Sequence, residues 1–256
     1  MTATPVRCAH THGGSVWHVH LDAPPGNVID SVMTRALDDI FVRAAKADNL
    51  RAVILEGEGD HFSFGASVQD HLPTRVHSFL PAFHDLFRRM FAAHVPVLAV
   101  VRGYCLGGGL ELATFCHRIF ASPTAQLGQP EIRLGVFAPV ASVLLPERIG
   151  RSAAEELCLS GRIVDAREAL ALGLMDGLAD DPLQAAHDYI ARHWQPHSIS
   201  SLRHAVRAIR ADLADHFERA IATAETHYRE ELMTTHDAVE GVAAFLEKRP
   251  PDWRNR

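Results

Sequence analysis

A run of three glycines constrains this chain more than any other feature of its sequence. Gly107-Gly-Gly109 lies between an apolar run typical of a buried strand (residues 95–101) and a helix-like stretch (residues 110–116). Glycine lets the backbone approach a ligand closely, and the amide groups at a helix start carry a partial positive charge. The junction therefore predicts a backbone anion site at the end of a buried strand.

Two glutamates accompany the glycines. Glu111 opens the helix-like stretch, and Glu131 follows 20 positions later in the segment Gln129-Pro-Glu131. Two carboxylates in one pocket push their pKa values apart, so that one can act as a base and the other as an acid near neutral pH. Beside an anion site, such a pair could polarise a carbonyl and move a proton. Taken singly, each glutamate also has a simple structural explanation. Glu111 could be a favourable negative charge in the first turn of a helix, and Glu131 could be a surface residue in a turn.

The composition is that of an ordinary soluble globular protein. Apolar residues make up 47% and charged residues 22% of the 256 residues, and the net charge is −6 with histidines neutral. This charge offers no electrostatic case for binding nucleic acid or an acidic membrane. The sequence begins without a signal-peptide pattern, contains no bilayer-length apolar run, and has four cysteines without motif spacing. We therefore expect a cytoplasmic protein with reduced thiols.

Strand and helix patterns alternate over the first three quarters of the chain, which predicts an α/β layered fold. Strands are expected at residues 16–21, 52–56, 95–101 and 117–122, with helices at 31–46, around 79–93 and at 110–116. Asp30 is a candidate helix cap, and Ser152 and Asp165 each precede a glutamate by three positions, as in a capping box. Gly173 is placed to end the helix that Asp165 starts.

The pattern changes near residue 197 to helices without a strand signal, expected at residues 201–213, 216–233 and 236–248. We therefore divide the chain into a core of residues 1–196 that carries the site and a helical C-terminal region of residues 197–256. The helical region is expected to pack on another body, in the same chain or in a neighbouring one.

Histidines are unusually frequent, at 17 in the chain. His10 with His12, and His18 with His20, have strand-like spacing that could suit a metal ion. No third ligand of the right type stands at a motif spacing, so we expect these side chains to face solvent on a sheet and predict no metal site.

Four blocks, in order, resemble the crotonase (enoyl-CoA hydratase/isomerase) superfamily. The second matches the family's G-x-x-x-G-G-G-x-E-L pattern, and the third its F-G-x-P-E-[IV]-x-L-G pattern. The resemblance implies a spiral of β-β-α repeats with a C-terminal helical region that builds trimers, usually paired into hexamers. The blocks are His61-Phe-Ser-Phe-Gly-Ala-Ser-Val68, residues 100–112, residues 127–135 and residues 237–249.

The resemblance also implies roles for four residues. The N–H groups of Ala66 and Gly108 would form an oxyanion hole for the thioester oxygen of an acyl-CoA substrate. Glu111 would hold and activate a water molecule, and Glu131 would handle the proton delivered to carbon. Many relatives with other chemistry lack one of the two glutamates, so the presence of both favours hydration. No metal or redox cofactor is implied, because CoA is part of the substrate.

Further positions match the family's substrate contacts. The adenine of CoA would lie against the segment Phe64–Ala66, which includes Gly65, near the turn from Pro25 to Val28. Gly107 belongs to the anion site, and Phe137 and Pro139 lie beside the acyl group. Phe245 and Lys248 match positions that reach CoA, often from a neighbouring subunit; a lone lysine on a terminal helix can equally be a solvated charge.

Two departures from the common pattern narrow the expected substrate. The family's glycine-rich run after P-E-x-x-L-G is replaced by bulkier residues at 136–146, and Phe64 and Ser67 stand where a small residue and an aspartate are usual. These segments resemble the cyclic dienoyl-CoA hydratases of anaerobic benzoyl-CoA degradation, which implies 1,4-addition of water to cyclohexa-1,5-diene-1-carbonyl-CoA. The alternatives are a short-chain enoyl-CoA hydratase or isomerase, and a non-catalytic acyl-CoA-binding protein.

Overall fold

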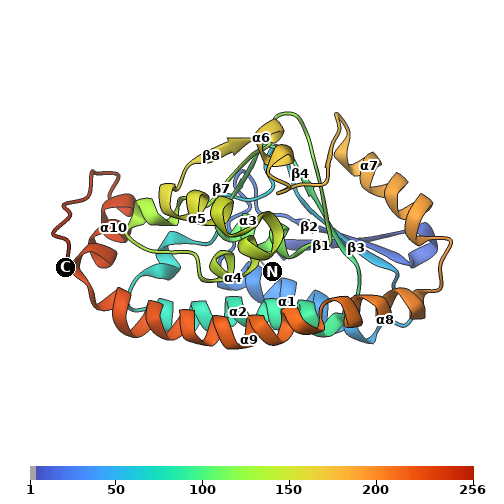
Figure 1. Cartoon of the computed structure of the whole chain (residues 1–256), viewed down its shortest axis with the longest axis horizontal. Coiled ribbons are helices and arrows are strands. Elements are labelled where there is room, and N and C mark those ends of the chain that lie inside the picture. The colour runs from blue at the N-terminus through green and yellow to red at the C-terminus, as the bar shows by residue number, and fades with distance from the viewer. Residues whose placement is uncertain (1–3) are drawn as a thin grey trace.

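A computed structural model describes residues 4–256 of the chain (Figure 1). Two sheets run through its centre. The larger has the order β1-β2-β3-β4-β6-β9, and the smaller the order β5-β7-β8. The strands are β1 (Val6–Thr11), β2 (Val16–Leu21), β3 (Ala52–Gly57), β4 (Val97–Val101), β5 (Tyr104–Leu106), β6 (Arg118–Ala121), β7 (Gln126–Gly128), β8 (Ile163–Asp165) and β9 (Gly177–Leu178).

Strand β4 shows why the centre of the larger sheet is so apolar. Val97, Ala99 and Val101 belong to the main core, whereas Leu98 and Val100 pack in a second cluster against helix α7 (Pro182–Tyr189). Side chains of a strand alternate between its two faces, so a strand covered on both sides needs a continuous apolar run. The expectation of a buried strand in this segment is confirmed.

The two sheets are built by a repeating chain path. Strand β4 continues into β5 and helix α3 (Gly108–Phe115), and β6 then continues into β7. β4 pairs in parallel with β6, and β5 pairs in parallel with β7. These two turns of the chain each add one strand to each sheet, as in the expected spiral of β-β-α units.

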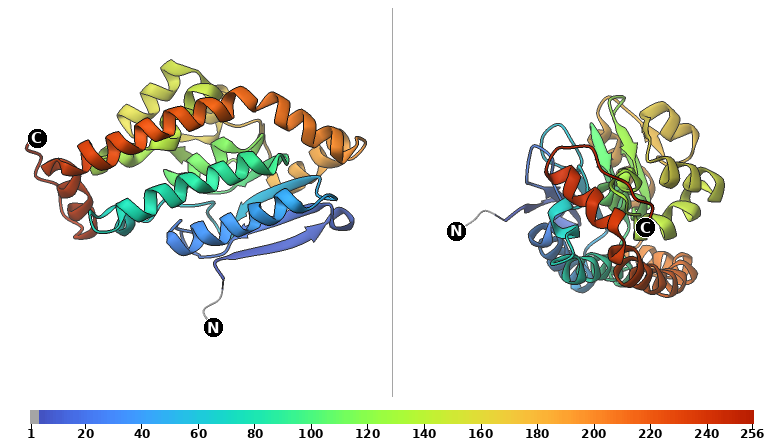
Figure 2. Two further views of the ribbon diagram at one scale, coloured as in Figure 1. Left: turned by 90° about the horizontal axis from the view of Figure 1, so that it is seen from below. Right: turned by 90° about the vertical axis from the view of Figure 1, so that its left-hand side faces the viewer.

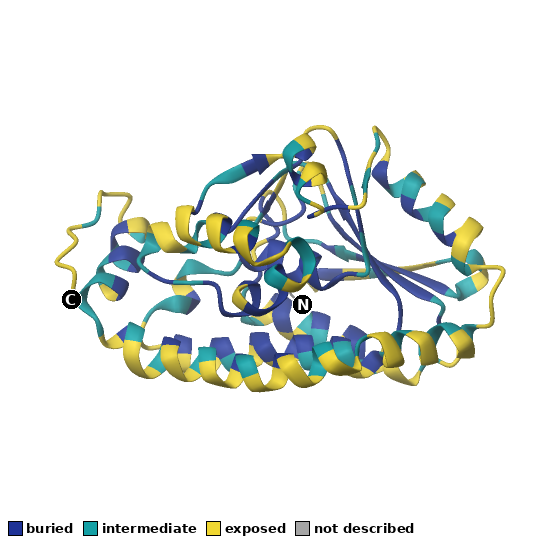
Figure 3. Cartoon of the chain, in the orientation of Figure 1, coloured by how far each residue is buried: buried dark blue, intermediate teal, exposed yellow. Residues whose placement is uncertain are grey.

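Helices cover the sheets and extend along one side of the molecule. In both Figure 1 and Figure 2, α9 runs beside α2, and α1 lies next to α2. Figure 3 shows that the outward side of α9 is exposed, whereas the central strands are buried. The remaining helices are α1 (Ser31–Lys46), α2 (Val76–Ala93), α4 (Pro139–Ile149), α5 (Arg151–Ser160), α6 (Ala166–Ala171), α8 (Ile199–Ile209), α9 (Ala211–Thr226) and α10 (His236–Leu246).

Between residues 199 and 246 the chain forms helices and helical turns without a strand. The expected second helix is divided: α9 ends at Thr226, and a π-helical turn (His227–Glu231) and a short 3-10 turn (Leu232–Thr234) follow. Helix α10 begins after Thr235, whose side chain accepts a hydrogen bond from the Ala238 amide. Within the described part of the chain, every helix is too short or too polar to traverse a lipid bilayer.

The predicted helix caps have mixed outcomes. Asp30 caps α1 by accepting hydrogen bonds from the amides of Val32 and Met33, at 2.9 and 2.8 Å. Asp165 caps α6 by accepting from the Glu168 amide at 2.9 Å, and Gly173 follows that helix with φ +75°. The capping box at Ser152 is wrong, because α5 begins one residue earlier, at Arg151, with Gly150 before it. The chain already bends sharply at Gly150, so no side-chain cap is needed there.

Replacing Asp30 with alanine should lower the free energy of unfolding by about 1 kcal/mol, because two amides at the start of α1 lose their acceptor. Ser152→Ala is the matched control and should change it by less than about 0.5 kcal/mol, since Ser152 does not cap a helix in this structure. Urea titration followed by circular dichroism measures both values. Equal destabilisation by the two variants would contradict the assignment of the caps.

Candidate active site

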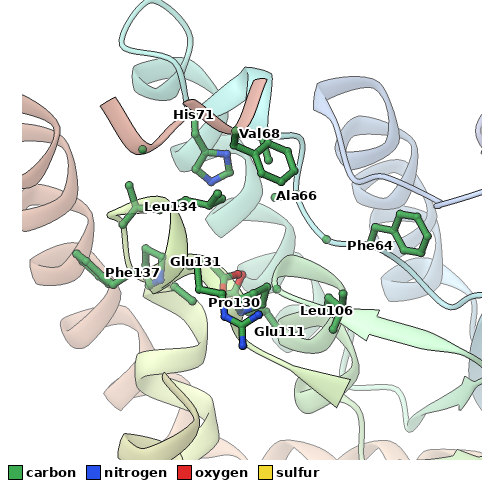
Figure 4. A pocket seen from close by; sticks show the side chains of 18 of the residues that line it. Phe64, Ala66, Val68, His71, Leu106, Glu111, Pro130, Glu131, Leu134 and Phe137 are labelled. Atoms are coloured by element: carbon green, nitrogen blue, oxygen red, sulfur yellow. The ribbon is translucent and has the colours of Figure 1, made fainter. Parts of the chain in front are cut away.

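One cavity of about 550 Å³ brings together most of the residues that the sequence singled out. Its wall combines the loop after β3, the start of α3, the 3-10 turn η3 (Pro130–Leu134), the start of α4 and part of α10. Figure 4 shows the side chains of Glu111 and Glu131 reaching the same part of this cavity. The predicted residues in its lining are Phe64, Gly65, Ala66, Gly107, Glu111, Glu131, Phe137, Pro139 and Phe245.

Two backbone amides lie close together at the side of this cavity. The backbone at Gly65 and Ala66 approaches the backbone at Gly108 so closely that a side chain would hardly fit between them. A Cβ atom placed on Gly108 would lie 3.0 Å from the Ala66 nitrogen, and one placed on Gly65 would lie 3.3 Å from the Gly108 nitrogen. Neither the Ala66 nor the Gly108 amide donates a hydrogen bond to another of residues 4–256. Paired, unoccupied amide donors are what an oxyanion hole requires.

Gly65 and Gly107 make this arrangement possible. Gly65 has φ +102°, and a Cβ there would lie 2.8 Å from the Leu106 carbonyl oxygen. Gly107 has φ +50°, and a Cβ there would lie 2.5 Å from Oε1 of Glu131. Both positions therefore need glycine for its backbone conformation and for close approach. The second contact shows that the glycine run makes room for the Glu131 carboxylate.

Glu111 is held by the start of another helix. It lies in the first turn of α3 and is buried, and its Oε1 accepts a hydrogen bond of 2.8 Å from the Ala141 amide of α4. Pro139 occupies the first position of α4, where its lack of an N–H costs nothing and its fixed φ favours the helix. The plain alternative for Glu111, a solvated first-turn charge, does not fit a buried side chain.

Glu131 also turns inward. Part of the residue is exposed, but its Oε2 atom is buried and has no hydrogen-bond partner among the described residues. It lies in η3, where Gly135 ends the turn with φ +70°. An unpartnered buried carboxylate oxygen is costly, so this group needs a ligand, a water molecule or its own proton.

The two carboxyl groups differ in their affinity for a proton. Burial raises the pKa of Glu111, and the backbone amides of Ala141 and Val140 partly oppose this rise. Burial also raises the pKa of Glu131, and the nearby charge of Glu111 raises it further. Glu111 has backbone donors from two residues of α4, whereas Glu131 has only its own backbone amide and feels its neighbour's charge, so a single proton shared by the pair resides mainly on Glu131.

The acyl side of the cavity is apolar and aromatic. The bulky replacements noted in the sequence contribute Val136, Phe137, Ala138 and Pro139 to its lining. Sequence reasoning missed the facing wall, formed from α2 and the turn before it, because ordinary core residues carry no motif. The missed lining residues are Val68, His71, Phe79, Leu80 and Phe83.

The expected CoA contacts are only partly gathered at the mouth of the cavity. Phe64 is exposed there, and its amide donates to the Gly26 carbonyl at 2.7 Å, which places the turn containing Pro25 and Val28 beside it. Pro25 and Val28 themselves are outside the cavity lining. Phe245 reaches the rim, whereas Lys248 is exposed just beyond α10 and outside the lining, where Arg249 is found instead.

The metal-ligating side chains in the cavity lining are those of Glu111, Glu131 and His71. Among residues 4–256, the one group of three such side chains within mutual reach is His18, His20 and Glu56, which lies outside the cavity. The two carboxyl groups and the two amide donors beside them offer acid–base chemistry and stabilisation of an oxyanion.

The raised pKa values predict a stability that depends on pH. Each folded-state pKa lies above the ordinary value of 4.5, so the folded protein holds these protons more tightly than the unfolded chain. The stabilisation of the folded protein that comes from these two protons is complete below pH 4.5 and is lost as the pH rises through the raised pKa values. Glu131→Gln, which cannot ionise, should gain stability relative to the parent from about pH 5 to about pH 9.

Thermal unfolding of both proteins across this pH range measures the difference. Glu155→Gln, at an exposed glutamate on α5, is the matched control and should follow the parent at every pH. A stability difference between Glu131→Gln and the parent that stays constant with pH would contradict the buried, protonated state of Glu131.

Comparisons with known proteins agree with this geometry. The chain is 47% identical over 254 residues to the cyclohexa-1,5-dienecarbonyl-CoA hydratase of Thauera aromatica, covering 99% of this chain and 98% of that protein. A probable enoyl-CoA hydratase of Rhizobium meliloti is 34% identical, with 95% and 96% covered.

Similar proteins are also found among solved structures. The crystal structure of an enoyl-CoA hydratase/isomerase from Pseudoalteromonas atlantica superposes with a TM-score of 0.86 at 28% identity, covering 97% of this chain and 99% of that one. The sequence pattern of the Enoyl-CoA hydratase/isomerase family matches residues 11–256. The family resemblance, the crotonase-like fold and the assignment as an enzyme of the enoyl-CoA hydratase type are thus confirmed. This chain belongs to the enoyl-CoA hydratase/isomerase family.

Proposed function

We propose that the protein adds water to an alicyclic dienoyl-CoA, cyclohexa-1,5-diene-1-carbonyl-CoA. The observation that carries this proposal is the meeting of two inequivalent glutamates in one cavity, with the free amides of Ala66, in its lining, and of Gly108, directly beside Ala66. An acid, a base and an oxyanion hole are the three parts needed to add water to a thioester-conjugated double bond.

The proposed reaction uses each part once. The thioester oxygen accepts hydrogen bonds from the amides of Ala66 and Gly108. The ionised Glu111 takes a proton from a water molecule, and the water oxygen bonds to the carbon β to the thioester carbonyl. The electron pair of the double bond then moves toward the thioester oxygen. Glu131 then gives its proton to carbon, and the double bond re-forms in its new position. No cofactor takes part.

Charge development explains why the amides matter. The enolate oxygen gains negative charge only as the water adds, so donors aimed at it stabilise the transition state more than the bound substrate. The apolar walls exclude bulk water and strengthen these hydrogen bonds. The raised pKa of Glu131 keeps a proton available near neutral pH, which an ordinary glutamate would lack.

Two observations favour a cyclic acyl group. The relative with 47% identity is a hydratase of this cyclic dienoyl thioester. The lining of the cavity is rich in aromatic side chains, among them Phe79, Phe83 and Phe137. In the cyclic diene the hydroxyl group adds at one end of the conjugated pair of double bonds and the proton at the other end.

A non-catalytic acyl-CoA-binding protein would have no use for this arrangement. Burying two carboxyl groups within reach of each other's charge opposes folding, because each is removed from water without an ion pair to a basic side chain among the described residues. A plain short-chain enoyl-CoA hydratase or isomerase would use the same groups, and the acyl substrate distinguishes it from the proposed enzyme.

We further propose that residues 1–196 form the catalytic core and that residues 197–256 build a homotrimer or homohexamer in the cytoplasm. Phe245 is 56% exposed although it stands at the rim of the cavity, so this aromatic ring is available to a CoA moiety or to a second subunit. Lys248, next to it, is suited to the phosphates of CoA bound to its own or a neighbouring chain.

The substrate proposal predicts a preference that can be measured directly. The purified protein is incubated with crotonyl-CoA and with cyclohexa-1,5-diene-1-carbonyl-CoA in parallel, and hydrated products are quantified by mass spectrometry. We expect kcat/KM to be at least about tenfold higher for the cyclic thioester, since about 1.4 kcal/mol of added transition-state binding suffices. A preference for crotonyl-CoA would reject the cyclic substrate while keeping hydratase activity.

Glu131→Gln should lower kcat by at least about 100-fold, because the amide cannot supply the proton. Binding of the CoA thioester should remain within a few-fold, since the oxyanion hole and the cavity walls are unchanged. Glu155→Gln again serves as the control and should keep full activity. Turnover of Glu131→Gln close to that of the parent would show that another group acts as the acid.

A further inference from the structure

We propose that His18, His20 and Glu56 form a binding site for a divalent transition-metal ion such as Zn²⁺. One ligand atom of each residue lies within 4.8 Å of the others. His18 and Glu56 are buried and His20 is half-buried, so the group is part of the folded structure and not a chance meeting of surface side chains. Two imidazoles and one carboxylate are a donor set that Zn²⁺ uses when it keeps a further position for water.

The sheet brings these ligands together. His18 and His20 are two residues apart on β2, so they project from the same face, and their rings lie 4.0 Å apart between centroids. Glu56 is the register partner of His20 on the parallel strand β3. His18 Nε2 and Glu56 Oε2 are 2.7 Å apart. The third ligand, which the sequence did not offer at a motif spacing, thus comes from a neighbouring strand.

Little movement is needed to accommodate a metal ion. Zn²⁺ binds nitrogen and carboxylate oxygen at about 2.0 to 2.2 Å, so two ligands of one ion stand about 3 to 4 Å apart. The His18–Glu56 contact would open slightly by side-chain rotation. The neutral imidazole of His18 carries one ring proton, which moves to Nδ1 through solvent as Nε2 binds the metal. Binding therefore forms two nitrogen bonds and one oxygen bond without net loss of a proton.

Surrounding groups hold the ligands in place. Arg102 pairs with Oε1 of Glu56, which leaves Oε2 toward the histidines. Oε2 of Glu58 lies 3.5 Å from Nδ1 of His20 and can orient that ring or serve as a fourth ligand. On the other side, His187 of α7 packs edge-on against the His18 ring. Such outer contacts orient metal ligands and raise their affinity.

Carboxylates offset the positive charges near the group. The guanidinium group of Arg7 pairs with Asp22 and Glu58, and that of Arg102 pairs with Glu56 and Asp181. These ion pairs reduce the repulsion that the two guanidinium groups would exert on a bound cation.

This site is distinct from the acyl cavity, since none of its three ligands lines that cavity. It lies on the face of the larger sheet that α7 covers, beside the second apolar cluster. An ion here would link β2 to β3 just before the chain leaves β3 for the loop that carries Ala66. We therefore expect the ion to stabilise the fold without taking part in hydration.

Isothermal titration of the chelator-treated, full-length protein with Zn²⁺ tests the proposal. We expect one site whose affinity falls at least about tenfold in His20→Ala and in Glu56→Gln. The control is His10→Ala: His10 pairs with Trp17 across β1 and β2, so it projects from the opposite face of the sheet. This variant should bind Zn²⁺ as the parent does.

A second measurement distinguishes the loss of the metal site from a folding defect. Zn²⁺ should raise the thermal midpoint of the parent and of His10→Ala, and should leave that of His20→Ala unchanged at the same concentration. Circular dichroism of each metal-free variant verifies that it is folded. Equal Zn²⁺ affinity in the parent and in His20→Ala, or the absence of a saturable site in the parent, would overturn the proposal.

Discussion

The structure depends on the burial of two carboxyl groups that form no ion pair within residues 4–256. Glu111 is stabilised by the Ala141 amide at the start of α4, and Glu131 has a buried oxygen without a partner. The energetic cost of this burial keeps a proton on one member of the pair, which turns two identical side chains into an acid and a base. The rest of the fold provides rigid positions for these groups: a spiral of paired strands ends at the amides of Ala66 and Gly108, and apolar walls exclude water.

The glycine run has two structural roles. Its start at Gly107 leaves room for the Glu131 carboxylate, and its middle residue, Gly108, contributes an amide at the beginning of α3. The same helix then presents Glu111 three residues later. A short stretch of backbone therefore determines the position of the anion site and of both carboxyl groups. This explains why a motif of so few residues carries so much information about the chemistry.

Much of the fold could be predicted from local patterns, and the errors have a common cause. Strand β2 and the cap at Asp30 follow from alternation and from hydrogen bonding within a few residues. The three-residue strands β5, β7 and β8 were missed because their pairing partners, not their own sequences, make them strands. The lining residues His71, Phe79 and Phe83 were missed for the same reason: only the folded chain brings them to the same cavity as Phe137. Glu56 became a neighbour of His20 through the register of two strands, which no spacing along the chain encodes.

The amide that holds Glu111 belongs to α4, and α4 packs against α9 of the C-terminal region. A substitution on the inner side of α9, at Phe217 or Ile221, that shifts this helix would therefore move the donor and alter the basicity of a carboxylate on α3. The packing of the long outer helix is thus mechanically linked to the proton chemistry of the site.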